Sequence, residues 1–146
     1  MTDATFQKVG KSHKRMYGPP CLVICGYRAD EQKEILSLIE GCGLLKQAVV
    51  FAGESDAGAI LGDIVKKESG KGRGLDSGLA RAIIMSGLAE NELHSLLSAY
   101  RNQKLPQQLW ATLTPISEGW TLTALLKELS AEAEAFRKRQ QEKQMD

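Results

Sequence analysis

The sequence has few of the residues from which catalytic and metal sites are usually built. It contains two histidines and three cysteines, and their spacing matches neither a zinc site nor a Ser-His-Asp triad. An odd number of cysteines, in a chain that starts without an apolar secretory leader, is typical of reduced thiols rather than of a disulfide framework. We therefore expect no cofactor and no metal, and a role outside enzyme catalysis.

The chain also lacks a strong net charge and long apolar segments. Its formal net charge is +1, so no overall basic field favours nucleic acid or an anionic membrane as a partner. No apolar run approaches the length of a membrane span. The length of 146 residues and the apolar content of 42% predict a single domain with its own core, and we expect this domain in the cytoplasm.

Apolar runs alternate with amphipathic segments, which predicts strands alternating with helices. Residues 1–20 are polar and predict a flexible basic arm, whereas residues 137–146 predict the polar end of the last helix. The α/β domain between them, residues 21–136, divides into halves at 21–67 and 80–136, joined by a basic glycine-rich loop at 68–79. Strands are expected at 21–27, 45–53, 80–87 and 109–114, and helices at 29–43, 55–67, 89–103 and 121–136.

The two halves match each other without a gap when the first is shifted along the chain so that Gly26 falls on Gly87 and Leu61 on Leu122. This match predicts a duplicated βαβα unit. A two-fold axis parallel to the strands would then give a wholly parallel four-stranded sheet of order 2-1-3-4. Right-handed crossovers would place helices 1 and 4 on one face, and helices 2 and 3 on the other.

In such a sheet a ligand binds beyond the carboxyl ends of strands 1 and 3, where the crossovers diverge. Those ends carry Cys25-Gly26 and Ser86-Gly87. Glycine permits close approach, and two helix N-termini would point their free amides at the same crevice. A small anion such as phosphate or a carboxylate is the guest expected there. The alternative is that both glycines only make the tight turn from strand to helix.

Thr114, Ser117 and Trp120 follow the fourth strand in the stretch TPISEGWTL, and two interpretations are open. They could line a binding site. Alternatively they build a joint, in which Thr121 caps the last helix and Trp120 packs on Leu125 as a hydrophobic staple. The cap and the staple account for the conspicuous residues, which favours the structural interpretation.

The segments SGL..NEL.SLL.AYR and L.A.LTP.S..WTL..LL.EL resemble a small bacterial family that is catalogued only as a domain of unknown function. The resemblance covers residues 83–129, and its most specific part is the LTP…WTL joint at 113–122. The chain departs from the family pattern at Ala89 and near Ala124, where a hydroxyl and an acidic residue are expected, and both departures weaken helix caps. The family implies this fold but no activity.

Basic residues and thiols offer weaker candidates. Lys11, Lys14 and Arg15 in the arm, with Lys71 and Arg73 in the loop, could hold RNA or another polyanion if both clusters shared one side. No aromatic residues are interleaved with them to stack on bases. The cysteines are interpreted as buried structural thiols. Among them Cys25 stands where a helix dipole could lower its pKa.

These patterns favour a small binding or regulatory module that acts through protein contacts. Its outer strands, the second and the fourth, are edges that a partner protein or a second copy could pair with. The runner-up is small-anion binding in the crevice, and the third possibility is polyanion binding. Nucleic acid and membrane are not favoured as partners.

Overall fold

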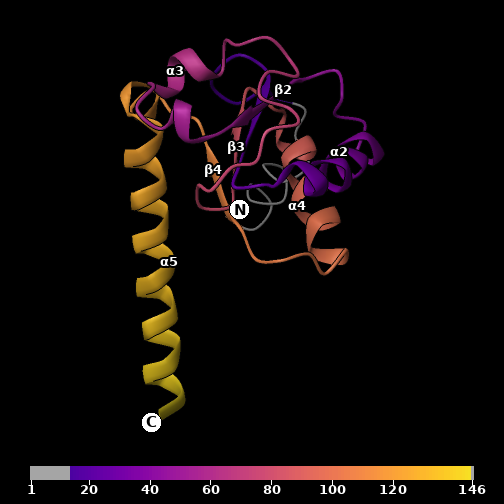
Figure 1. Ribbon diagram of the computed structural model, residues 1–146. Coiled ribbons are helices and arrows are strands. Elements are labelled where there is room, and N and C mark those ends of the chain that lie inside the picture. The colour runs from indigo at the N-terminus through magenta and orange to yellow at the C-terminus, as the bar shows by residue number, and fades with distance from the viewer. Residues whose placement is uncertain (1–13, 146) are drawn as a thin grey trace.

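The computed structural model describes residues 14–145, which form a four-stranded sheet with helices on both faces (Figure 1). The strands are β1 (Cys21–Cys25), β2 (Ala48–Ala52), β3 (Ala82–Ser86) and β4 (Leu109–Thr112). The helices are α2 (Gln32–Gly41), α3 (Leu61–Ile64), α4 (Glu90–Asn102) and α5 (Leu122–Met145), with 3-10 turns η1 (Ala29–Glu31), η2 (Glu54–Asp56) and η3 (Ser117–Gly119). Within this described part, no helix combines the length and the apolar character that crossing a membrane requires.

The sheet has the expected order, β2-β1-β3-β4, but it is mixed. β1 pairs with β2, and β3 with β4, in parallel, whereas the central strands β1 and β3 are antiparallel. The prediction of a wholly parallel sheet was therefore wrong. The cause is an additional pass of the chain: residues 69–71 run along the outer edge of β2, so the chain enters β3 from the opposite end. That pass has no apolar pattern that would reveal it.

The expected distribution of helices over the two faces was also wrong. Residues of α2 and α4 pack with one face of the sheet, around Ile24 and Ile83. Residues of α3 and α5 pack with the other face, around Val23 and Ile84. Because β1 and β3 are antiparallel, a two-fold axis that superposes one half on the other must be perpendicular to the sheet. Such an axis keeps the first helices of the two halves, α2 and α4, on one face, and the second helices, α3 and α5, on the other. The second helix is also short, since the segment predicted as helix from residue 55 begins with the turn η2.

The pairing registers of the two halves differ by the same offset that relates their sequences. Cys21 lies opposite Ala48 in the first half, and Ala82 lies opposite Leu109 in the second. The central antiparallel pair is symmetric about Val23 and Ile84. An isolated bridge joins Ile60 to Thr121, which are equivalent positions of the two halves. The strand pairings of the two halves therefore repeat at this offset.

Candidate functional site

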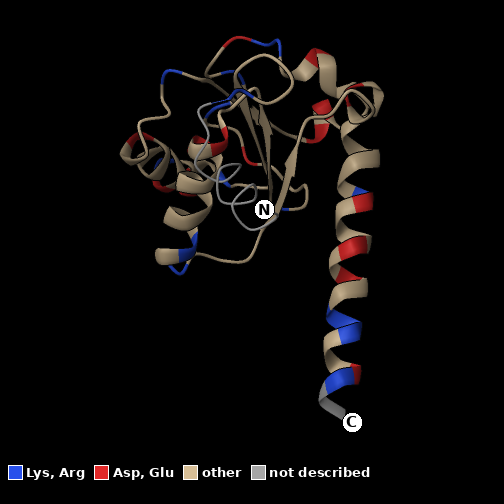
Figure 2. Ribbon diagram, turned by 180° about the vertical axis from the view of Figure 1, so that it is seen from behind, with Lys and Arg blue, Asp and Glu red and all other residues tan. Residues whose placement is uncertain are grey.

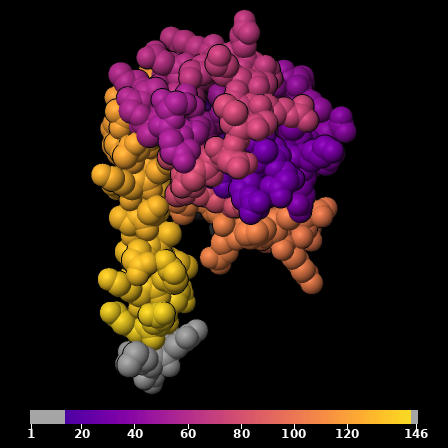
Figure 3. Space-filling model, in the orientation of Figure 1, coloured from indigo at the N-terminus to yellow at the C-terminus, as the bar shows by residue number. Residues whose placement is uncertain are grey.

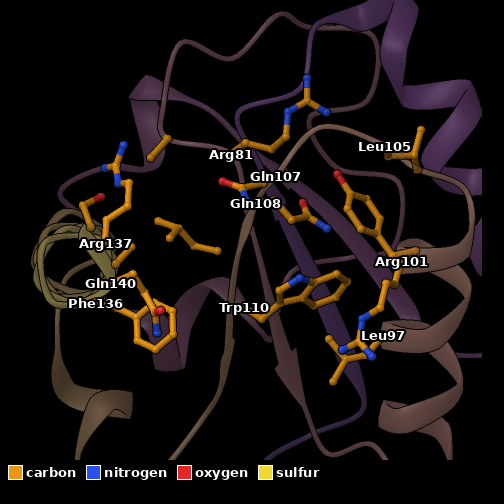
Figure 4. Close-up of a pocket in the computed structure, with 15 residues that line it drawn as sticks. Arg81, Leu97, Arg101, Leu105, Gln107, Gln108, Trp110, Phe136, Arg137 and Gln140 are labelled. Carbon is orange, nitrogen blue, oxygen red and sulfur yellow. The ribbon is translucent and has the colours of Figure 1, made fainter. Parts of the chain in front are cut away.

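A groove of about 850 Å³ runs beside β4, between α4 and α5. Figure 4 shows Phe136 and Arg137 on the α5 side, Leu97 and Arg101 on the α4 side, and Trp110 between them. The recess separates the C-terminal part of α5 from the body of the molecule, while the first turns of α5 pack against the core (Figure 3). Its lining is Ala80, Arg81, Leu97, Tyr100, Arg101, Leu105, Gln107, Gln108, Leu109, Trp110, Ser130, Ala133, Phe136, Arg137 and Gln140.

The outer edge of β4, whose residues Leu109 and Trp110 line the groove, carries unpaired backbone groups among the described residues. The amides of Leu109 and Leu113 donate to the carbonyls of Arg81 and Met85, each at 2.9 Å, so they point toward β3. Because successive residues of a strand alternate in direction, the amides and carbonyls of Trp110 and Thr112 point away from the sheet. Among residues 14–145 no group pairs with them along that edge. Within the described residues, β4 is thus an open edge strand.

The equivalent edge on the other side of the sheet is closed by the chain itself. The offset between the halves carries Val49 and Phe51 of β2 onto Trp110 and Thr112 of β4. The Val49 amide donates to Ser69 Oγ at 2.9 Å, and the Val49 carbonyl accepts from the Gly70 amide at 2.7 Å. The Phe51 amide donates to the Lys71 carbonyl at 2.9 Å. An extended segment therefore fits this type of edge, and within the described chain β4 lacks one.

Side chains around β4 are also less buried than those of the other strands. All residues of β1 and β3 are buried, whereas every residue of β4 is half-buried. The Trp110 ring is fixed by an edge-to-face contact with Tyr100, with ring centroids 5.3 Å apart. Phe136, on the opposite wall, is 58% exposed. The groove thus offers ordered apolar surface to a ligand.

Among the described residues, the charged side chains that line the groove are all arginines. Arg81 is committed to the protein: its guanidinium bonds Glu31 at 2.6 Å and lies 4.1 Å from the centre of the Tyr27 ring. Arg137 pairs with Glu134, which lies one turn earlier on the exposed part of α5; basic residues become more frequent beyond it (Figure 2). Among residues 14–145, Arg101 on α4 forms no ion pair with an acidic residue.

The crevice expected between strands 1 and 3 does not form. Since these strands are antiparallel, Cys25 lies opposite Ala82 and Ser86 lies opposite Cys21. The segments Cys25-Gly26 and Ser86-Gly87 are therefore at opposite ends of the sheet, and one ligand cannot contact both. The shared carboxyl edge on which that prediction depended is absent because β3 runs in the reverse direction.

At each end the glycine accommodates the protein's own chain. A Cβ on Gly26 would lie 2.6 Å from the backbone of Arg81, and one on Gly87 would lie 2.3 Å from the Gly18 carbonyl. The Gly26 amide donates to Ser77 Oγ at 3.1 Å, and the Gly87 amide donates to the Tyr17 carbonyl at 2.9 Å. These amides already have acceptors, as the turn interpretation requires.

The joint after β4 also satisfies itself. The Thr114 amide donates to Ser117 Oγ, and the Ser117 amide donates to Thr114 Oγ1, both at 3.0 Å. Thr121 Oγ1 accepts from the Ala124 amide at 3.2 Å, so the predicted cap of the last helix is confirmed. The carbonyl of Trp120 accepts a hydrogen bond from the Leu61 amide, while Trp120 itself is 36% exposed. The polar groups of Thr114 and Ser117 therefore hold the loop rather than face a ligand.

The basic residues do not share one side of the sheet. Arg15 bridges to Ala89 beyond the end of β3 and donates to the Gly87 carbonyl at 2.7 Å. Lys14 precedes it on the same segment, and residues 14–17 of the expected arm are thus attached to the domain. Lys71 and Arg73 belong to the loop at the opposite end, beside Phe51. Lys11 lies outside the described residues.

The thiols are structural. Burial raises the pKa of Cys21 to about 12, and burial together with the charge of Asp56 raises that of Cys25 to about 12. At Cys25 desolvation outweighs the lowering of the pKa that a helix dipole could have caused, because the side chain has no solvent contact. Cys42 is half-buried, and burial raises its pKa as well. In the described chain no cluster of histidine, cysteine and acidic residues suits a metal ion.

Sequence reasoning named the second and fourth strands as edges but did not find the groove. The residues that it missed are Leu97, Arg101, Trp110, Phe136 and Arg137. One signal was present in the sequence: Phe136 continues the apolar positions of the last helix into a stretch that is otherwise polar. A large apolar residue in a polar stretch indicates that this face of the helix lies beside another apolar surface of the protein or of a ligand.

A comparison with known protein families agrees with the resemblance that residues 83–129 show to a domain of unknown function. Residues 81–136 match the model of a family described as Domain of unknown function (DUF3783). The match spans β3, α4, β4 and α5 as far as Phe136, so it includes most of the groove lining but not Ala80, Arg137 and Gln140. No curated protein matches the chain. No solved structure matches it either.

Proposed function

We propose that this protein is a protein-binding module that accepts an extended segment of a partner protein as an additional strand on β4. The observation that carries this proposal is the difference between equivalent edges. Val49 and Phe51 are bonded by residues 69–71, whereas Trp110 and Thr112 have no such segment among the described residues. Strand addition at an open edge is a common mode of peptide recognition, since the backbone bonds supply affinity and side-chain pockets supply specificity.

The surroundings of β4 support the same function. Open edges invite uncontrolled pairing, and proteins usually protect them with charges, prolines or covering segments. Here α4 and α5 extend beyond the edge on both faces, so access is restricted to a segment thin enough to enter between them. The result is a recessed edge that admits an extended peptide and excludes a whole sheet.

We further propose a cytoplasmic location and an origin of the two halves by duplication. The first is supported by the three cysteines, which are free thiols. The second is supported by the pairing registers, which repeat at the offset of the sequence match. Duplication would leave two equivalent edges, of which one has been closed by the loop and the other kept for binding.

The proposal can be tested with a capped peptide, QQIVTVIQQ, which has an apolar core and neutral ends. In the free protein the amides of Trp110 and Thr112 should exchange with solvent rapidly, because they lack acceptors. Saturating peptide should slow both, while the amides of β2 remain unchanged. If peptide binds elsewhere, or leaves these two amides unprotected at every concentration, the proposal is wrong.

Two variants separate backbone pairing from apolar contact. Thr112→Pro removes an outward amide at an edge position, where proline is tolerated, and should weaken binding about fivefold, the value of one hydrogen bond of about 1 kcal/mol. Phe136→Ala should weaken it by a similar factor through lost apolar contact. Ile116→Ala is the matched control, because Ile116 is 75% exposed but lies outside the groove. Equal effects of the Phe136 and Ile116 changes would contradict the site.

A further inference from the structure

We infer that the strand accepted by β4 combines an apolar core with acidic residues, and that Arg101 and Arg137 select it. This inference rests on the proposed function, and it assigns a chemical class to the partner. It depends on three features of the groove: the layers that flank the edge, the sign of the charges that line it, and the positions of the two arginines on opposite walls.

The flanking layers determine the centre of the strand. Side chains of β4 alternate between the two faces: Leu109 and Ala111 pack on the α5 side, and Trp110 packs on the α4 side. A strand beside β4 continues that alternation, with one face toward Leu97 and the other toward Phe136. A strand that is covered on both faces is apolar on both, as the strands of buried sheets are. An amphipathic strand would place polar groups against one of the walls.

The charges determine the polar residues of the strand. Within residues 14–145 the charged residues that line the groove are Arg81, Arg101 and Arg137, while Glu132 and Arg139 line an adjoining hollow that shares Trp110 and Phe136 with the groove. Arg81 is bonded to Glu31 and stacked on Tyr27, so it is not available. Arg101 and Arg137 project from α4 and α5 on either side of the recess (Figure 4). The side chain of Arg137 is 69% exposed, and its pairing with Glu134 is of the exposed kind that competes weakly with a ligand carboxylate.

A second copy of this chain is a poorer occupant of the groove. Pairing of β4 with another β4 would bring a second Arg101 and a second Arg137 into the same recess, where like charges repel. Glu134 compensates Arg137 in each copy, but among the described residues no carboxylate pairs with Arg101. Acidic residues on a partner strand would instead form charge-assisted hydrogen bonds with the two arginines, and guanidinium groups suit carboxylates because they can bind them with two parallel bonds.

The test compares three capped peptides with one core: EEIVTVIEE, QQIVTVIQQ and KKIVTVIKK. In titrations at low salt the affinity should decrease from the acidic to the neutral to the basic peptide, and the acidic peptide should bind about fivefold more tightly than the neutral one. That factor corresponds to about 0.5 kcal/mol for each of two partly exposed ion pairs. Raising the salt concentration should remove most of the preference by screening. Equal affinities of the acidic and neutral peptides would overturn the inference while leaving the proposed function intact.

Substitution identifies the residues responsible. The double variant Arg101→Gln, Arg137→Gln should lose the preference for the acidic peptide but still bind the neutral peptide and protect the amides of Trp110 and Thr112. Arg73→Gln, which removes a cation from the loop at β2, is the control and should leave the preference unchanged. A preference that survives the double substitution would assign selection to other residues and refute the inference. So would sedimentation that shows self-association through β4 which none of the peptides reverses. Absence of binding by all three peptides would refute the proposed function itself.

Discussion

Substitution of Gly72 by alanine should disrupt the segment that closes the edge of β2. Gly72 has a φ of +81°, and a Cβ at this position would lie 2.0 Å from the Phe51 carbonyl oxygen. Real Cβ atoms do not approach an oxygen so closely, so the loop must move away from the strand. Movement would break the bond from the Phe51 amide to Lys71 and the bond from the Gly70 amide to Val49.

The expected loss of stability follows from these two effects. A residue with a side chain in the left-handed region costs about 1–2 kcal/mol. Each lost backbone hydrogen bond costs about 1 kcal/mol once water replaces the partner. Together they give a decrease in the free energy of unfolding of about 3–4 kcal/mol. Gly74→Ala is the matched control: Gly74 has a φ of +90°, but a Cβ there would have no neighbour within 4 Å, so only the first cost of about 1–2 kcal/mol applies.

The assay is urea unfolding of the parent and both variants, together with amide exchange of Phe51. Gly72→Ala should lower the unfolding midpoint more than Gly74→Ala does, and only Gly72→Ala should accelerate exchange of the Phe51 amide. If the two variants have the same midpoint and Phe51 remains protected, residues 69–71 do not close the edge in the way described. The comparison of β2 with β4 would then lose its basis.

Three further predictions concern the caps, an ion pair and the thiols. Ala89→Ser should raise the free energy of unfolding by about 1 kcal/mol in urea, because α4 has no side-chain cap at that position; an unchanged midpoint would argue against it. Hydrogen bonds from the Arg28 amide and the Arg81 guanidinium lower the pKa of Glu31. The ionised Glu31 therefore stabilises the fold fully above the ordinary glutamate pKa of about 4, and this contribution is lost as the pH falls through the lowered pKa. Glu31→Gln should therefore cost about 1 kcal/mol at neutral pH and progressively less in acid, and a cost independent of pH would exclude an electrostatic origin. With iodoacetamide near neutral pH, Cys42 should react first and Cys25 only on unfolding, since burial raises the pKa of Cys25 to about 12; early labelling of Cys25, detected by mass spectrometry, would show that its strand opens.

Much of the local structure follows from the sequence because local structure depends on neighbouring residues. Apolar runs bounded by glycine or proline predicted the four strands, the match between the halves predicted their order, and Thr121 predicted the cap of α5, where its hydroxyl accepts from the Ala124 amide. The offset between the halves is a property of the sequence, and it reappears in the pairing of Cys21 with Ala48 and of Ala82 with Leu109. The outer strands were also identified as edges from order alone.

Only the tertiary structure decided the direction of β3, the faces on which the helices lie and which edge stays open. A buried strand has the same apolar pattern whether its neighbour is parallel or antiparallel, so burial could not report direction. Residues 69–71 close the edge of β2 mainly through backbone groups, which every sequence supplies and no pattern reveals. The groove beside β4 exists because α5 replaces that segment in the second half, and its walls meet only after the chain has folded.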